Sequence, residues 1–293
     1  MSIQHPVIAV TGSSGAGTST VTKSFDLVFR REKLSAAIVE GDSFHRYDRK
    51  SMKVAAEEAR LGGNNHFSHF GPEANLLEEL AGLFKTYGDT GKGKVRQYLH
   101  NADEAAPYGQ QSGEFTPWED IATGSDLLFY EGLHGLVKTE KSDTAQHVDL
   151  GIGVVPIVNL EWIQKIHRYN AERGYSAEVI VDTILRRMPD YVHYITPQFS
   201  LTDINFQRVS TVDTSNPFIT RDIPTPDESL IVIRFKDPAK FGIDFPYLLN
   251  MIHNSFMSRR NTIVVPGGKM AMAMEIILTP IIHDMIEKSK KAR

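Results

Sequence analysis

The sequence contains no cysteine among its 293 residues. This absence excludes disulfide bonds, thiolate metal sites and cysteine-based catalysis or redox switching. The chain also lacks any apolar run approaching the roughly 18 residues that a membrane-spanning helix needs. Its first residues, Met-Ser-Ile-Gln-His-Pro, have neither the basic nor the apolar region of a secretory signal. We therefore expect a cytoplasmic protein with no membrane partner.

A strong charge of either sign is missing as well, since the formal net charge is −4 with 23% charged residues. Overall attraction to nucleic acid is not indicated, so we expect no nucleic-acid partner, and any anion site must come from local basic clusters. The hydrophobic content of 41% is ordinary for a globular protein. The length allows one large α/β domain or two small ones. Because the sequence shows no internal repeat or low-complexity tract, we favour a single domain over residues 1–293.

Apolar, β-branched runs alternate along the chain with segments of helical periodicity. This alternation predicts βαβ units and an α/β fold with a mainly parallel sheet flanked by helices. The predicted strands are Val7–Thr11, Ala36–Glu40, Leu127–Tyr130, Leu150–Pro156, Tyr191–Ile195, Leu230–Phe235 and Thr262–Val265. The predicted helices are Ser19–Arg31, Met52–Leu61, Glu73–Tyr87, Leu160–Arg173, Ala177–Arg187, Pro246–Phe256 and Met270–Lys290.

A glycine-rich segment follows the first predicted strand and precedes the first helix. It matches the phosphate-loop pattern G-x-x-x-x-G-K-[ST], except that Thr18 stands where the lysine is expected. A strand, glycine loop and helix N-terminus direct backbone N–H groups and partial positive charge at a phosphate. The missing lysine normally contacts the β- and γ-phosphates, so the loop either binds no triphosphate or receives positive charge from elsewhere. The predicted nucleotide-binding residues are Gly12, Ser13, Ser14, Gly15, Ala16, Gly17, Thr18, Ser19 and Thr20.

Acidic residues follow two predicted strands, at the sheet edge where α/β folds bind ligands. Asp42 is suited to accept a hydroxyl proton, and helical spacing would place Asp42, His45, Arg46 and Arg49 on one face. A solvated polar turn capped by Asp42 is the alternative. Ser19, Asp42 and Glu131 together offer the hard oxygen ligands that suit Mg²⁺ carried by a nucleotide; for Glu131 a simple strand-end cap is the alternative.

Two predicted helices between residues 159 and 190 are rich in cations. Lys165 and Arg168 are i, i+3 neighbours on one face of the first helix, and the next helix adds a second basic pair. We interpret this region as a lid whose cations close over the phosphates and replace the missing lysine. A solvated helix face is the alternative. The lid cations are Lys165, Arg168, Arg173, Arg186 and Arg187.

A cation, a phenol and an imidazole alternate at Arg96, Tyr98 and His100. On a strand they would share one face, which fits either a wall of the second-substrate site or a half-buried edge strand. His66 and His69 lack the spacing of a metal site, and we interpret them as structural.

The combined pattern resembles the phosphoribulokinase/uridine kinase family in its short, proteobacterial phosphoribulokinase form. The segments that carry the resemblance are Gly12–Thr20, Glu40–Arg49, Phe67–Asn75, Leu127–Gly135, Val154–Lys165, Gln198–Pro217 and Ser258–Gly267. It implies a P-loop NTPase-like fold with a helical lid and extra C-terminal strands and helices. It also implies transfer of the ATP γ-phosphate to the 1-hydroxyl of ribulose 5-phosphate, with Mg²⁺. Threonine at position 18 is normal in this family.

The resemblance also implies residue roles. Asp42 would be the general base, Lys165 and Arg168 would act in transfer, and Ser19 and Glu131 would bind the Mg-nucleotide. The implied substrate-binding residues are His45, Arg49 and Arg173, with Arg31 assisting. The alternating pattern adds Tyr98 and His100 to the substrate-binding set, and the lid interpretation adds Arg186 and Arg187 on the nucleotide side.

Members of this type are homo-oligomers that NADH activates and AMP inhibits, and Arg234 and Arg259 match arginines linked to that control. The disulfide control of the plant enzymes is excluded here by the absence of cysteine.

Tyr169 departs from the family pattern, which has an aspartate at this position. Two other functions therefore stay open: a related kinase acting on uridine or another pentose phosphate, and a nucleotide-binding regulatory protein with weakened turnover. The basic His45–Arg49 segment favours a substrate that is already phosphorylated. The retained Asp42, Glu131 and Lys165 argue against a purely regulatory protein.

Overall fold

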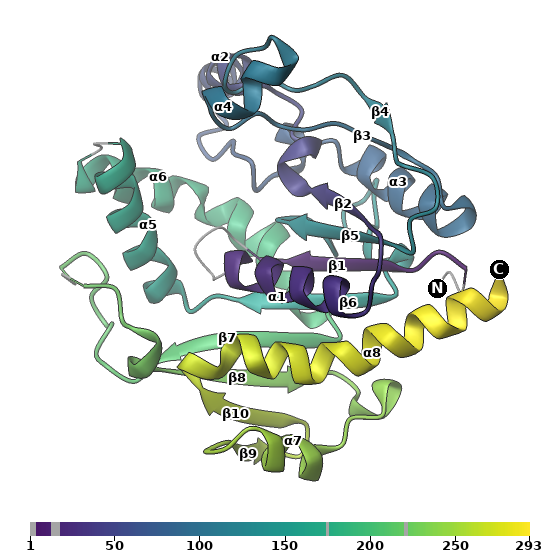
Figure 1. Ribbon diagram of the computed structural model, residues 1–293. Helices are drawn as coiled ribbons and strands as arrows, with labels where there is room; N and C mark the ends of the chain where they lie inside the picture. The colour runs from purple at the N-terminus through teal and green to yellow at the C-terminus, as the bar shows by residue number, and fades with distance from the viewer. Residues whose placement is uncertain (1–3, 13–17, 174–175, 220–221) are drawn as a thin grey trace.

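A computed structural model describes residues 4–12, 18–173, 176–219 and 222–293 of the chain. Its centre is an eight-stranded sheet with the strand order β2-β5-β1-β6-β7-β8-β10-β9 (Figure 1). The pairings from β2 to β7 are parallel and those from β7 to β9 are antiparallel. The strands are β1 Val7–Thr11, β2 Ala36–Glu40, β5 Leu127–Gly132, β6 Leu150–Val155, β7 Ile204–Ser210, β8 Ser229–Phe235, β9 Phe256–Arg259 and β10 Thr262–Pro266. A separate small ribbon pairs β3 Lys94–Val95 with β4 Glu119–Asp120.

Helices cover both faces of this sheet, as continuous apolar strands require. In β1, Ile8 and Val10 belong to one buried cluster, whereas Val7 and Ala9 belong to the other. The first cluster lies under α1 and α8, which run together across the sheet, and the second lies under α3 (Figure 1). The helices are α1 Thr18–Arg31, α2 Arg49–Leu61, α3 Leu77–Thr90, α4 Ala102–Ala105, α5 Val158–Arg173, α6 Ala177–Asp190, α7 Phe245–Met251 and α8 Met270–Ala292.

Two predictions of secondary structure are wrong, and the strand β7 was missed. Tyr191–Ile195 is a π-helical turn that continues α6, and its buried residues, Tyr191 and Ile195, are four apart as in a helix rather than alternating. The predicted helix Pro246–Phe256 ends at Met251, and Phe256 begins β9. The strand β7 was not predicted, because polar residues separate its core residues Ile204 and Phe206 and so no continuous apolar run marks it.

The parallel strands place their carboxyl ends along one edge of the sheet, where β1, β2 and β5 lie side by side. The helices α5 and α6 lie at one side of this edge, and α2 and α4 lie at another (Figure 1). Among the residues described, no helix is long and apolar enough to cross a membrane.

Candidate active site

A cavity of about 1360 Å³ opens at the carboxyl ends of β1, β2 and β5. Residues from every part of the predicted site line it, although they come from five separate stretches of the chain. Those among the predicted residues are Gly12, Asp42, His45, Arg49, Tyr98, His100, Glu131, Lys165, Arg168 and Arg187. The fold therefore brings four of the six predicted substrate residues and three of the five lid cations around one space, together with Gly12 of the phosphate loop.

Two predicted residues do not reach this cavity. Arg31 is the last residue of α1, and thirteen helical steps of about 1.5 Å place it roughly 20 Å from the helix start beside the phosphate loop. The geometry does not support Arg31 as a substrate contact within its own chain. Arg186 is also absent from the lining, and its Nε lies 4.0 Å from the Asp182 carboxylate one helical turn earlier. The sequence predicted the helix that carries Arg186 but not the direction of the Arg186 side chain.

Several predicted site residues lie outside the described part of the chain. These are Ser13, Ser14, Gly15, Ala16 and Gly17, together with the side chains of Thr18, Ser19, Thr20, Tyr169 and Arg173.

The loop that carries Asp42 is a 3-10 turn, Gly41–Phe44, rather than the expected longer helix. At His45 the backbone becomes extended, with φ −62° and ψ 141°, and bridges to Asn75. The prediction of one helical face for Asp42, His45, Arg46 and Arg49 is therefore wrong. Arg46 instead donates hydrogen bonds to the backbone carbonyls of Glu73 and Asn75.

A close approach of two glycines holds this loop against β5. A Cβ added to Gly132 would lie 2.6 Å from the Cα of Gly41, and the reverse distance is 2.8 Å. Neither position has room for a side chain. The backbone of the Asp42 loop is therefore in direct contact with the strand end that carries Glu131.

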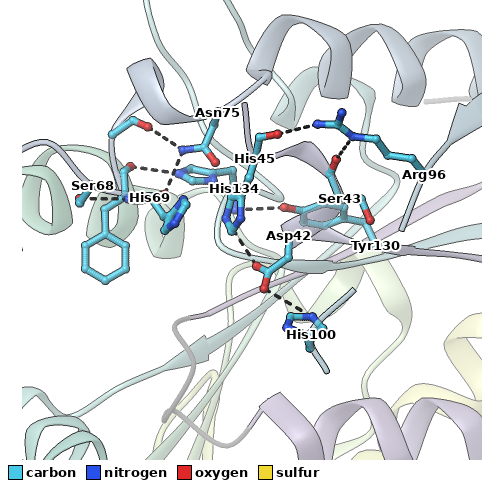
Figure 2. Close-up of polar contacts among 12 residues, drawn as sticks. Asp42, Ser43, His45, Ser68, His69, Asn75, Arg96, His100, Tyr130 and His134 are labelled. Atoms are coloured by element: carbon cyan, nitrogen blue, oxygen red, sulfur yellow. Dashed lines mark hydrogen bonds and ion pairs between the residues drawn. The ribbon is translucent and has the colours of Figure 1, made fainter. Parts of the chain in front are cut away.

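The carboxylate of Asp42 lies between two imidazoles (Figure 2). Its Oδ1 is 3.5 Å from Nε2 of His45, and its Oδ2 is 3.8 Å from Nε2 of His100. Burial, with the nearby charges of His134 and His100 adding to it, lowers the pKa of His45 to about 3. At neutral pH His45 is thus a neutral imidazole that offers hydrogen bonds, and not the cation that a basic segment suggested.

His69 lines the same cavity and stacks on His45, with ring centroids 3.9 Å apart and an interplanar angle of 26°. Burial, followed by the charges of His45 and Arg187, lowers the pKa of His69 to about 3. The interpretation of His69 as structural missed its place in the cavity lining. The only available signal was its place in the family-like segment Phe67–Asn75, because the stacking partner is 24 residues earlier in the chain. His66 instead contacts Asp190, with Nδ1 3.1 Å from Oδ1.

Arg49, Tyr98 and His100 line the cavity near the starts of α2 and α4. Arg49 donates to the carbonyl oxygen of His100 and to the hydroxyl of Ser112, both at 2.9 Å. The ring of Tyr98 lies edge-on to the rings of His45 and His100, with centroids 6.2 and 4.9 Å away. Of the alternating residues Arg96, Tyr98 and His100, the last two line the cavity and Arg96 does not.

Lys165 is nearly buried and forms an ion pair with Glu161, one turn earlier in α5. The other oxygen of Glu161 accepts a hydrogen bond of 3.0 Å from the hydroxyl of Tyr191, and Lys165 Nζ lies 5.3 Å from the centre of the Phe70 ring. Burial and the Glu161 charge raise the pKa of Tyr191. Sequence reasoning identified Lys165 but missed Glu161, although their i, i+4 spacing was a visible signal.

The donor set at the sheet edge suits a cation carried by a nucleotide. Asp42 and Glu131 contribute carboxylate oxygens to the cavity, beside Gly12 of the phosphate loop. Within the described residues no group of three or more histidine or acidic side chains is arranged to hold a metal ion alone. Mg²⁺ with phosphate oxygens among its ligands fits such an incomplete set of hard oxygen donors.

Comparison with known proteins accounts for this arrangement. The model of the "Phosphoribulokinase / Uridine kinase family" matches residues 7–215. The chain belongs to this family. It is 61% identical to the chromosomal phosphoribulokinase of Cupriavidus necator over 292 residues, which cover 100% of this chain and 99% of that protein. Identity to the phosphoribulokinase of Xanthobacter flavus is 63% over 292 residues, with both chains fully covered.

A solved structure of phosphoribulokinase from Rhodobacter spheroides matches the fold of this family member with a TM-score of 0.90. The two sequences are 55% identical, and the match covers 99% of this chain and 100% of the other. The P-loop kinase fold that the resemblance implied is therefore confirmed.

Proposed function

We propose that the chain is an ATP-dependent, Mg²⁺-requiring kinase that phosphorylates ribulose 5-phosphate at its 1-hydroxyl, giving ribulose 1,5-bisphosphate. The observation that carries this proposal is the single cavity in which the phosphate-loop strand, Asp42, Arg49 and Lys165 meet. Full-length relatives at about 60% identity are named phosphoribulokinase. A cytoplasmic location is part of this proposal.

In this mechanism Asp42 accepts the proton of the attacking 1-hydroxyl. Its carboxylate is suited to the role because it faces the cavity, is partly exposed and is flanked by His45 and His100. The cations Lys165 and Arg168 act from α5 on the charge that develops on the transferred phosphoryl group. Ser19 and Glu131 would hold Mg²⁺ carried by ATP, and the ion would supply positive charge beside the β- and γ-phosphates.

The sugar phosphate is held from the opposite side by His45, Arg49, Tyr98 and His100, with Arg173 from the lid. Neutral His45 and Tyr98 can hydrogen-bond sugar hydroxyls, whereas Arg49 supplies the charge that a phosphate needs. We infer that α5 and α6, residues 159–190, close as a lid and bring Arg187 to the nucleotide. Release of Lys165 from Glu161 would accompany that closure.

An assay of ADP release with ribulose 5-phosphate or uridine tests the proposed substrate. We expect turnover with ribulose 5-phosphate alone, and we expect Asp42→Asn to lower kcat by about 10²–10⁴-fold because it removes the base. Turnover with uridine alone would support a related kinase. No turnover with either, despite measurable ATP binding, would support a regulatory protein.

We also propose a homo-oligomer with an effector site at Arg234 and Arg259. These residues lie on β8 and β9 and both pair with Thr262 of β10, so their exposed side chains share one face of the sheet. Two arginines on the strands either side of β10 suit a phosphate-bearing effector such as NADH or AMP. Adding NADH to the same assay is expected to stimulate the wild type but not Arg234→Glu; stimulation of both would refute the site.

A further inference from the structure

Arg96 lies outside the cavity lining but holds the loop that carries Asp42 (Figure 2). Its Nε donates to the carbonyl oxygen of Ser43 at 2.9 Å, and its Nη2 donates to that of His45 at 2.6 Å. Ser43 directly follows Asp42, and His45 is the residue whose imidazole contacts the Asp42 carboxylate. One guanidinium thus fixes the backbone on both sides of Phe44.

Aromatic rings hold the guanidinium in place. Its carbon lies 3.7 Å from the ring centre of Phe115 and 4.8 Å from that of Trp118. Trp118 also packs edge-on against Phe44 of the Asp42 loop, with ring centroids 5.6 Å apart. A planar fork between rings has little freedom to reorient, and a lysine at this position would supply neither the fork nor the stacking surface.

The side-chain contacts of Asp42 are too long to position it. The distances from its oxygens to Nε2 of His45 and of His100, 3.5 and 3.8 Å, exceed those of good hydrogen bonds. The place of its carboxylate therefore depends mainly on the backbone of the short 3-10 turn. Since a displacement of about 1 Å can cost about 10²-fold in rate, whatever fixes that backbone matters for proton transfer.

We propose that Arg96 is a positioning residue for phosphoryl transfer, acting through the Ser43 and His45 carbonyls to hold Asp42 where it meets the substrate hydroxyl. This inference rests on the proposed function, in which Asp42 is the base. A purely structural role would lower thermal stability without changing the turnover of the folded enzyme.

The test compares Arg96→Lys and Arg96→Ala with the wild type. We expect kcat with ribulose 5-phosphate to fall by roughly 10–10²-fold in both, while KM for Mg-ATP changes by less than about twofold because the phosphate loop is on another strand. Millimolar guanidinium is expected to restore part of the kcat of Arg96→Ala but not of Arg96→Lys. A kcat within twofold of the wild type in Arg96→Ala, or a lower melting temperature as the sole change, would overturn the proposal.

Arg293→Ala is the matched control. The Arg293 guanidinium also donates to backbone carbonyls, those of Gln4 at 2.7 Å and Asp126 at 3.0 Å, but at the amino ends of the strands. Removing it should leave kcat unchanged, and guanidinium should have no effect on that variant. A similar loss and rescue in Arg293→Ala would contradict a specific role for Arg96.

Amide hydrogen exchange separates this inference from the proposed function. The amide of Arg46 donates to Ala74, and that of Leu76 donates to Phe44, both at 2.8 Å. Exchange at these amides should be faster in Arg96→Lys than in the wild type, whatever the substrate. If the wild type turns over no ribulose 5-phosphate, the proposed function fails, but the exchange rates still test whether Arg96 fixes the backbone of the Asp42 loop. Unchanged exchange rates at these amides would refute that role of Arg96.

Discussion

Among single residues, Tyr169 is the one whose substitution tells most about the kcat of this site. It lies one helical turn after Lys165 in α5, at the position where the family resemblance led us to expect an aspartate. We expect Tyr169→Asp to raise kcat, by several-fold up to about 10²-fold, because a carboxylate beside the transfer cations would assist metal or phosphate alignment. Initial-rate kinetics with saturating Mg-ATP and ribulose 5-phosphate measure this effect.

Tyr169→Phe is the control for that measurement. It removes the hydroxyl without adding a carboxylate, so we expect its kcat to stay near that of the wild type. If Tyr169→Asp leaves kcat unchanged or lowers it, the site has been rebuilt around the tyrosine, and the aspartate is not a missing helper.

Sequence reasoning found the residues whose signal is local and missed those whose partners are distant. Asp42 was predicted because it follows a short apolar strand, and Lys165 because it shares a helix face with Arg168. Arg96 was noticed, but its partners Ser43 and His45 lie about fifty residues earlier, so its role was invisible. No pattern in one sequence encodes such a contact, because it arises only when two loops pack together.

Among secondary-structure elements, the buried strands were the easiest to predict. The boundaries of β1 and β2 match the predicted ones, since each is a short apolar run with turn residues close by. The segment Tyr191–Ile195 failed because its β-branched and aromatic residues favour a strand locally. Packing of Tyr191 and Ile195 into the core overrides that preference and continues the helix.

The contact between the Asp42 loop and β5 gives a prediction at this scale. Gly132→Ala would place a methyl group 2.6 Å from the Cα of Gly41, so the loop must move away from the strand. We expect kcat to fall by at least about 10-fold, because displacement of the base is costly. The free energy of unfolding should also fall, by about 1–3 kcal/mol for overpacking. Steady-state kinetics and urea denaturation check both.

Gly82→Ala is the matched control, since Gly82 lies within α3 and an added Cβ meets nothing within 4 Å. Alanine there should raise the unfolding free energy by about 0.5–1 kcal/mol through helix propensity and leave kcat unchanged. If Gly132→Ala and Gly82→Ala had the same kcat, the close approach of Gly41 and Gly132 would have no consequence for catalysis.

At the scale of the whole molecule, the sheet runs without interruption from β2 to β9. We propose on this basis that residues 1–293 form one domain. The alternation of strands and helices predicted the layers, and the rule for parallel sheets predicted the edge that holds the site. The sequence predicted α5 and α6 as a lid near the phosphates, and a substrate-site wall was one interpretation of the segment with Tyr98 and His100. The contacts that these segments make around the cavity were not predictable, because they depend on packing between segments far apart in sequence.

The same packing buries three imidazoles beside the cavity, which links global stability to pH. Burial lowers the pKa of His45 and His69 to about 3 and that of His134 to about 4, from an ordinary value of 6.5. In the folded protein these rings stay neutral, whereas in the unfolded chain they bind protons below pH 6.5. Stability from neutral histidines is therefore present above pH 6.5 and falls as the pH drops toward 4.

We expect the free energy of unfolding to decrease between pH 7 and pH 5, by roughly 2 kcal/mol per histidine at pH 5. Glu40 and Asp190 oppose this trend, because burial raises their pKa values and the folded state holds their protons more tightly. Because the pKa values of three histidines lie far below their ordinary value, their effect exceeds that of the two carboxyl groups, and the net slope from pH 7 to 5 keeps the histidine sign. Urea denaturation across this range measures the slope. In His134→Gln, the slope should shrink by about one third, because one of the three imidazoles is removed. A flat profile in the wild type would mean that these imidazoles are protonated equally in both states.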